Sequence, residues 1–223
     1  MRRLLVTVLV LGLLLVVGDR VAAGVAASQA EKRLAAHGFA AASVQFHDFP
    51  FLTQLLERRF LFVSLNSQQV RVKQGQAADV QAQLHGVQAE GQSAVRVSRL
   101  EADGTVPYAE VARAAGVPSL RLGPAPGGQV RISRAVDLLG QHYTVTTQAH
   151  VKAMGTRLRV EPTSVELQGG GVLNSQLSQL LAGRIAIDYP VPNLPQGVRI
   201  TGVTAGPSGF VVHVTGQNVL LAG

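Results

Sequence analysis

The 223-residue chain carries a net charge of +7 and contains neither cysteine nor tryptophan. The absence of cysteine excludes disulfide bonds, thiolate metal ligands and the lipid-modified cysteine of a bacterial lipoprotein. A basic balance favours nucleic acid, anionic lipid or an acidic polymer as partner, and the alternative is an arginine-rich surface that only meets solvent.

The N-terminus has the layout of an export signal. Arg2 and Arg3 precede an uncharged apolar run, residues 4–17, which is shorter than the roughly 20 residues that span a bilayer comfortably. Residues 1–18 are therefore expected to form a signal peptide or a signal anchor. The protein is expected to be exported to the periplasmic, extracytoplasmic face of the plasma membrane, which argues against nucleic acid as a partner.

A helical stripe continues past this signal and leaves two interpretations open. Ala23, Ala27, Ala30 and Leu34 share one helix face, and Gly38 follows as a C-terminal cap. A helix over residues 19–37 would be damaged by cleavage at Ala23 or Ala27. Either these alanines belong to a cleaved signal, or the segment is a retained anchor.

The remaining chain alternates apolar and polar residues with the period of antiparallel strands. The pattern predicts strands at 78–85, 95–97, 129–133 and 210–215, and turns at 73–75, 102–104, 124–128, 169–171 and 206–209. Short helices are predicted at 107–115 and 174–182, with a single turn at 50–56. The expected fold is one α+β domain over residues 19–223, with a strongly curved antiparallel sheet packed around a long N-terminal helix.

Signatures of catalysis are absent from the sequence. It contains no nucleophile elbow, no zinc-protease motif and no phosphate-binding glycine loop, and its six histidines lie far apart. Neighbouring residues on a strand point to opposite faces, so His47 and Asp48 do not form an orienting pair. No enzyme activity, cofactor or metal is expected.

Four of the seven phenylalanines gather in one segment, Phe46 to Phe60, which is followed closely by Phe62. Its Phe49-Pro50-Phe51-Leu52-Thr53-Gln54 motif, the Arg59-Phe60 pair, and the 190–198 and 209–216 segments resemble the lipomannan-elongation (LmeA-type) family of actinobacterial phospholipid-binding envelope proteins. Asp48 and Arg58 stand where that family usually has glycine. The backbone conformation at these two positions is therefore where the chain is expected to differ from the family.

The resemblance implies a periplasmic protein that binds or carries anionic phospholipid or lipoglycan precursors in lipomannan-type envelope maturation, with a tubular lipid-binding-like fold. Acyl chains would lie in an apolar groove and the headgroup would meet arginine. The candidate lipid-binding residues are Phe49, Pro50, Phe51, Leu52, Leu55, Arg58, Arg59, Phe60 and Phe62. Because Pro50 disfavours regular structure on its N-terminal side, Phe49 and Phe51 are expected on a loop or lip.

Two other functions remain open. The apolar strip could be a protein interface of a non-catalytic scaffold for an envelope glycosyltransferase. Alternatively, the chain could be an exported enzyme that modifies lipoglycan. For each phenylalanine and arginine, ordinary core or surface placement is the competing interpretation.

Overall fold

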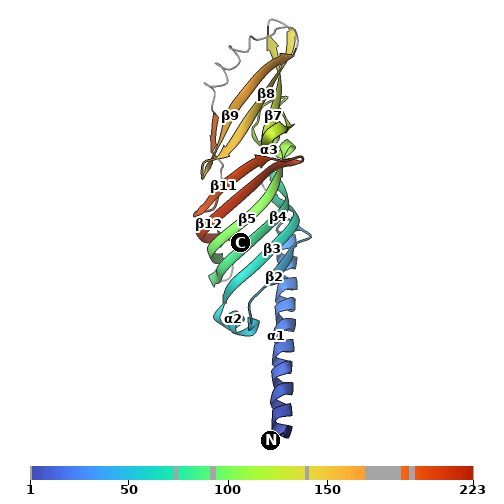
Figure 1. The fold of residues 1–223 in the computed structure, drawn as a ribbon, viewed down its shortest axis with the longest axis vertical. Helices are drawn as coiled ribbons and strands as arrows, with labels where there is room; N and C mark the ends of the chain where they lie inside the picture. The colour runs from blue at the N-terminus through green and yellow to red at the C-terminus, as the bar shows by residue number, and fades with distance from the viewer. Residues whose placement is uncertain are drawn as a thin grey trace.

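The computed structural model describes residues 2–72, 75–90, 94–138, 141–168, 187–190 and 194–222. Figure 1 shows an elongated molecule in which a long helix projects from one end of two successive sheets. The helices are α1 (Arg2–Ala36), α2 (Phe51–Glu57) and α3 (Tyr108–Ala114). The predicted N-terminal helix is confirmed and is longer than residues 19–37. It packs chiefly against α2 and the first two strands, β1 (Phe39–Ala40) and β2 (Ser43–Phe46).

Two antiparallel sheets make up the rest of the described chain. Sheet A has the order β1-β3-β4-β5-β12-β11, with β2 also paired to β3, and sheet B has the order β10-β9-β8-β7-β6. The further strands of sheet A are β3 (Arg59–Val72), β4 (Gly75–Glu90), β5 (Ala94–Pro107), β11 (Val198–Ala205) and β12 (Gly209–Ala222). Those of sheet B are β6 (Arg121–Ala125), β7 (Gln129–Leu138), β8 (Gln141–Ala153), β9 (Arg157–Gln168) and β10 (Ile187–Pro190). The predicted fold class, a sheet-dominated α+β domain with a long N-terminal helix, is confirmed.

The register shows how the alternating sequence builds one apolar face of sheet A. Directly paired residues of antiparallel strands share a face, and the pairings place two apolar rows side by side across five strands. The rows are Val63, Leu84, Leu100, Gly216 and Val198, and Leu65, Ala82, Ala102, Val214 and Ile200. The neighbouring row, Gln83, Glu101, Thr215 and Arg199, is polar and exposed.

One predicted turn is wrong, because strand β5 runs unbroken through residues 102–104. Gly104 lies where β4 carries an extra residue, between the pairs Ala78–Thr105 and Gln81–Asp103. A Cβ on Gly104 would meet the Val80 side chain at 3.3 Å. The glycine therefore makes room for a β-bulge and does not end a strand.

The other expected turns and helices have different outcomes. The turns around residues 126–128 and 206–209 and helix α3 are confirmed. The expected helix at 174–182, the turn at 169–171 and two residues of the turn at 73–75 lie outside the described residues.

The main core lies where the two sheets meet. It contains buried Val130 and Ala149 from sheet B and Ile200, Val203 and Phe210 from sheet A. Tyr108 of α3 joins it, edge-on to Phe210 at 5.1 Å, and its hydroxyl donates to the Gly206 carbonyl oxygen at 2.6 Å. Burial raises the pKa of the Tyr108 hydroxyl. This core fixes α3 at the junction.

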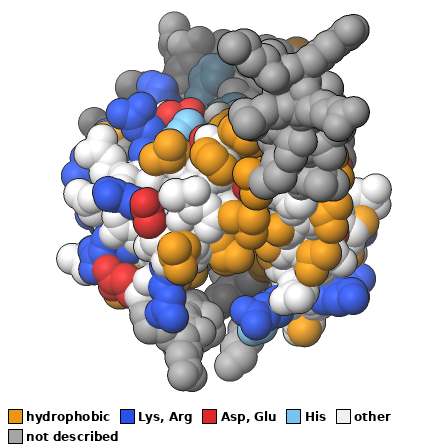
Figure 2. Space-filling view, turned by 90° about the horizontal axis from the view of Figure 1, so that it is seen from below, with side chains coloured by type: hydrophobic (Ala, Val, Ile, Leu, Met, Phe, Trp, Pro, Cys, Tyr) orange, Lys and Arg blue, Asp and Glu red, His pale blue; other side chains and the backbone are white. Residues whose placement is uncertain are grey.

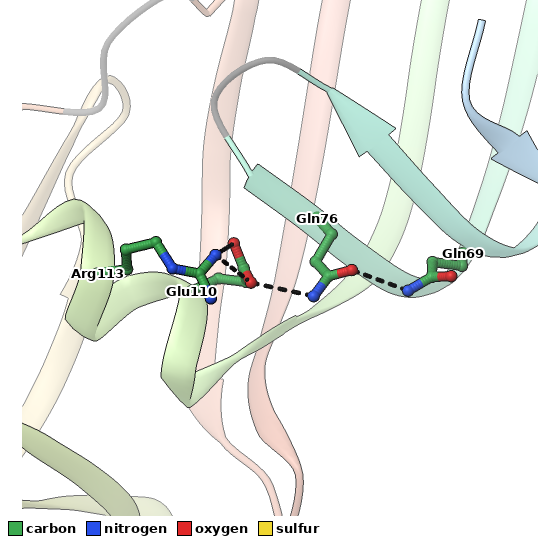
Figure 3. Close-up of polar contacts among 4 residues, drawn as sticks. All are labelled: Gln69, Gln76, Glu110 and Arg113. Carbon is green, nitrogen blue, oxygen red and sulfur yellow. Dashed lines mark hydrogen bonds and ion pairs between the residues drawn. The ribbon is translucent and has the colours of Figure 1, made fainter.

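A polar chain ties the same helix to the β3–β4 hairpin (Figure 3). Arg113 donates to both oxygens of buried Glu110, at 2.7 and 2.8 Å. Glu110 also accepts from Gln76 at 3.0 Å, and Gln76 accepts from Gln69 at 2.9 Å. The buried carboxylate is thus paired, as a buried charge requires.

Candidate functional site

Helix α2 lies at the end of sheet A from which α1 projects (Figure 1). Its first residue, Phe51, is only 1% exposed and packs against Phe46 and Phe60, with ring centroids 5.2 and 5.8 Å away. Phe46 and Phe60 lie 5.0 Å apart. These three rings are the small core that holds α2 against the sheet.

The expectation that Phe51 lies on an exposed lip is therefore wrong. Pro50 does interrupt regular structure, but it occupies the residue just before α2, so the helix starts at Phe51 and directs that ring inward. Phe49, one residue before the proline, is 53% exposed as expected. Its ring lies under the Arg20 guanidinium of α1, 5.3 Å from the centroid.

The exposed side of α2 carries a stripe of leucines beside the polar residues Thr53 and Glu57. Leu52, Leu55 and Leu56 occur at helical positions i, i+3 and i+4, and their exposed fractions are 45%, 47% and 86%. In soluble proteins such a stripe normally faces the core. Leucines on the outer side of a helix indicate a surface made to meet an apolar partner.

Helix α1 supplies the cap of α2. The Asp19 carboxylate Oδ1 accepts a hydrogen bond from the Leu52 N–H at 2.8 Å, and the residue is only 3% exposed. Burial raises the pKa of Asp19, but the backbone N–H groups of Phe51 and Leu52 and the charge of Arg20 together lower it below its usual value. Asp19 is therefore held charged at the α1–α2 contact.

The residue that ends α2 is one of the two departures from the family glycine pattern. Arg58 has φ 54° and ψ 34°, the left-handed conformation that glycine adopts without strain at helix C-termini. The other departure has a different role, because Asp48 accepts a hydrogen bond from the Phe62 N–H at 2.5 Å. An aspartate thus fills a backbone-bonding role that glycine has no side chain to perform.

Both candidate arginines are exposed at this end of the molecule. With the Gln88 amide oxygen turned toward it, Arg59 donates from Nε and Nη2 at 2.9 and 3.0 Å. Neither Arg58 nor Arg59 forms a salt bridge with a carboxylate among the described residues. Their charges are thus available to an external anion.

Figure 2 shows this end of the molecule directly, with hydrophobic side chains gathered toward the middle and Lys and Arg around the margin. The exposed hydrophobic residues of the two helices and their loop are Leu15, Val16, Val17, Val21, Val25, Phe49, Leu52, Leu55 and Leu56. We call the part formed by Leu15, Val16, Phe49, Leu52, Leu55 and Leu56 the apolar end, because Leu15 and Val16 lie one turn before Asp19 on the helix face that meets α2. Its contributions from α1 and α2 are joined by Asp19.

Phe62 is not brought together with the other candidates. Its ring stacks between His47 and His85, with centroids 4.5 and 4.6 Å away, whereas Phe60 joins the Phe46 and Phe51 rings. Between Phe60 and Phe62, the alternation of side chains between the two faces of sheet A is interrupted. Gly86 of β4 and Asn218 of β12 have left-handed φ values of 63° and 50°. This interruption separates two phenylalanines that lie only two positions apart.

Sequence reasoning missed three residues of this end. Leu56, the most exposed leucine of α2, was detectable from the Leu52–Leu55–Leu56 spacing. Arg20 lies just after the export signal, and no pattern in the sequence linked it to this end. Asp19 gave no detectable signal, because its hydrogen bond crosses 33 residues of sequence.

Other chemistry finds little support in the described residues. They contain no group of three or more His, Asp or Glu side chains placed to hold a metal ion. A polar basin of about 610 Å³ on sheet B is lined by residues including Arg121, Arg131 and Arg134. Within the described part of the chain, no helix is long and apolar enough to cross a membrane.

An open sheet with one apolar face, next to an end rich in exposed leucine and arginine, is the arrangement expected of a lipid-binding protein. Comparison of sequences identifies the class more closely. The chain belongs to the LmeA-like phospholipid-binding family, whose model matches residues 17–215. No curated protein and no solved structure matches the chain significantly.

Proposed function

We propose that this protein binds or carries anionic phospholipid, or a lipoglycan precursor built on one, at the extracytoplasmic face of the plasma membrane, in lipomannan-type envelope maturation. Membership of a phospholipid-binding family is the observation that carries the proposal. The apolar face of sheet A supplies a physical basis for it, as do Arg58 and Arg59 at its α2 end, which form no salt bridge among the described residues.

The acyl chains would lie along the apolar face of sheet A. Leu65, Leu84, Leu100, Ala102 and Val214 are all only partly buried there. Each acyl methylene that leaves water for such a face contributes about 0.8 kcal/mol. Ala82 and Ala102 are the smallest side chains of their row, and they lie side by side on two neighbouring strands.

The phosphate would meet arginine at the α2 end. A guanidinium binds phosphate through paired donors, and Arg58 and Arg59 have no competing carboxylate in the described structure. An exposed cation near an anionic surface contributes about 1 kcal/mol. Anionic lipid is therefore favoured over zwitterionic lipid.

The N-terminal segment would stay attached and hold the protein at the membrane. Asp19 and Arg20 contact Leu52 and Phe49, and both lie upstream of the cleavage sites at Ala23 and Ala27. Cleavage at either site would remove the cap of α2. The family match also begins upstream of both sites, at residue 17.

Two variants on opposite faces of sheet A test the proposal. Ala102→Phe adds a bulky ring to the apolar face, whereas Thr215→Phe places the same ring on the exposed polar face of the neighbouring strand. Each protein is purified, its fold is checked by circular dichroism, and its solvent extract is analysed by mass spectrometry. We expect bound anionic phospholipid in the parent and in Thr215→Phe, and a reduced load in Ala102→Phe.

The two alternative functions predict different results. An extract free of phospholipid from all three folded proteins would contradict lipid binding and favour a scaffold for an envelope glycosyltransferase. Turnover of an added lipoglycan by the parent protein would instead favour an enzyme.

A further inference from the structure

The orientation of α2 is unusual for a helix on the surface of a soluble domain. Phe51 anchors its inner side in the aromatic core, while Leu52, Leu55 and Leu56 cover its outer side. The burial of Phe51 fixes the helix rotation, so these leucines cannot turn inward without removing that ring from its core. The leucine stripe is thus held outward by the fold.

Helix α1 continues this apolar surface away from the body. Leu15 and Val16 are exposed, and they lie one turn before Asp19 on the face of α1 that contacts α2. Upstream, α1 runs on past α2 toward the N-terminus (Figure 1), through the uncharged residues 4–17. The exposed apolar surface therefore adjoins a segment, residues 4–17, whose lack of charge suits it to lipid.

The distribution of charged side chains around α2 also favours an anionic surface as the partner. Arg20, Arg58 and Arg59 are exposed at the level of α2, with Glu57 as an exposed acidic neighbour, and in Figure 2 Lys and Arg, with fewer Asp and Glu, lie around the margin of the hydrophobic side chains. Leucines flanked by arginines match the layers of an anionic bilayer surface, where acyl chains lie below phosphates. A protein partner would have only the leucine stripe of a 7-residue helix to bind, which is a small surface for a protein interface.

We propose that the apolar end is a bilayer-docking surface, in which the leucines of α2 enter the acyl boundary of an anionic membrane and Arg20, Arg58 and Arg59 bind its phosphates. The inference rests on the proposed function, because docking at this end brings the apolar face of sheet A to a source of lipid. Asp19 joins α1 and α2, so both helices enter the interface as one unit.

Because the chain lacks cysteine, one introduced thiol can report on one position of the full-length protein. An environment-sensitive fluorophore is attached to Leu56→Cys and, as the matched control, to Met154→Cys. Both native side chains are exposed, and Met154 lies in the turn between β8 and β9 of sheet B. Labelled proteins are mixed with phosphatidylcholine vesicles that contain or lack phosphatidylglycerol, with doxyl-labelled lipid as quencher.

We expect the Leu56 label to shift to the blue and to be quenched several-fold more than the Met154 label, and more strongly when phosphatidylglycerol is present. Vesicle-bound protein whose Leu56 label behaves like the Met154 label would overturn the proposal, because α2 would then stay in water while the N-terminal segment alone holds the protein. Disulfide-linked dimers of the unlabelled Leu56→Cys protein, together with an unquenched label in the labelled sample, would also overturn it, in favour of a second copy as the partner.

Bound phospholipid is measured by mass spectrometry on the same samples. Protein that is quenched at Leu56 but carries no phospholipid would contradict the proposed function and support the docking surface. Protein that carries phospholipid but is not quenched at Leu56 would support the proposed function and contradict the docking surface. A triple variant, Leu52→Ser, Leu55→Ser and Leu56→Ser, provides an independent check: we expect it to keep its circular dichroism spectrum and to load lipid from vesicles several-fold more slowly.

Discussion

Asp19 caps a helix to which it does not belong. Its Oδ1 accepts from the Leu52 N–H at 2.8 Å, whereas the residue in the usual capping position of α2, Pro50, makes no side-chain capping bond. A helix of 7 residues is too short to be stable alone. Its existence therefore depends on the aromatic core beneath it and on the carboxylate supplied by α1.

Removal of the Asp19 charge should loosen α2. We expect Asp19→Asn to increase amide hydrogen exchange across residues 51–57 and to lower the unfolding midpoint by a few degrees, with Asp19→Ala having the larger effect. Hydrogen exchange with peptide resolution measures this. Ser28→Ala, on an exposed face of α1, is the control, and equal protection of α2 in all variants would contradict the role of the cap.

The same carboxylate makes the α1–α2 contact sensitive to acid. The folded-state pKa of Asp19 lies below its ordinary value of 3.8, so its stabilisation is present above that value and is lost as pH falls through the lower, folded pKa. We expect the opening of residues 51–57, measured as hydrogen exchange relative to the intrinsic exchange rate at each pH, to rise on acidification in the parent. The additional rise should be absent in Asp19→Asn, which has no carboxylate at that position to titrate.

Arg58→Gly should stabilise the protein. A left-handed residue with a side chain costs about 1–2 kcal/mol, and the greater backbone entropy of glycine offsets about 0.5–1 kcal/mol of the gain. The expected net effect is about +0.5 to +1 kcal/mol in chemical denaturation. Arg58→Ala keeps the strain and should leave stability nearly unchanged, yet both variants should bind anionic vesicles about fivefold more weakly through the lost charge.

A buried and an exposed position of α2 should respond in opposite ways. Phe51→Ala removes a ring that is 1% exposed and should cost about 3–5 kcal/mol of unfolding free energy. Leu56→Ser, at 86% exposure, should change stability by no more than about 0.5 kcal/mol while weakening vesicle binding. Denaturant titration and vesicle flotation of the same two proteins distinguish core from docking residue, and comparable destabilisation by both would contradict the assignment.

Local patterns predicted much of the fold, because strand alternation and turn chemistry depend on neighbouring residues. The rows through Leu84 and Val214 follow directly from period-two spacing. The turn predicted at residues 102–104 was wrong because a glycine in a turn and a glycine opposite a β-bulge cannot be distinguished from the sequence of one strand. Only the pairing with β4 distinguishes them.

The candidate site was less predictable, because its arrangement depends on contacts between distant segments. The segment around Phe49 to Phe60 was found from its composition, but which ring faces inward depends on how α2 starts after Pro50. Asp19 could not be assigned a role before α1 and α2 were placed together. The lipid-binding roles of the individual side chains stay predictions.

The contact between the two sheets has a consequence for solubility. A sheet that keeps one apolar face open is exposed to edge-to-edge aggregation wherever a terminal strand offers unpaired backbone groups. At the β11 edge of sheet A, the Ile200 N–H donates to the Gly155 carbonyl oxygen at 2.8 Å, and Gly155 belongs to the turn that joins β8 and β9. Sheet B thus caps part of this edge, so that a second molecule cannot extend the sheet by pairing at Ile200.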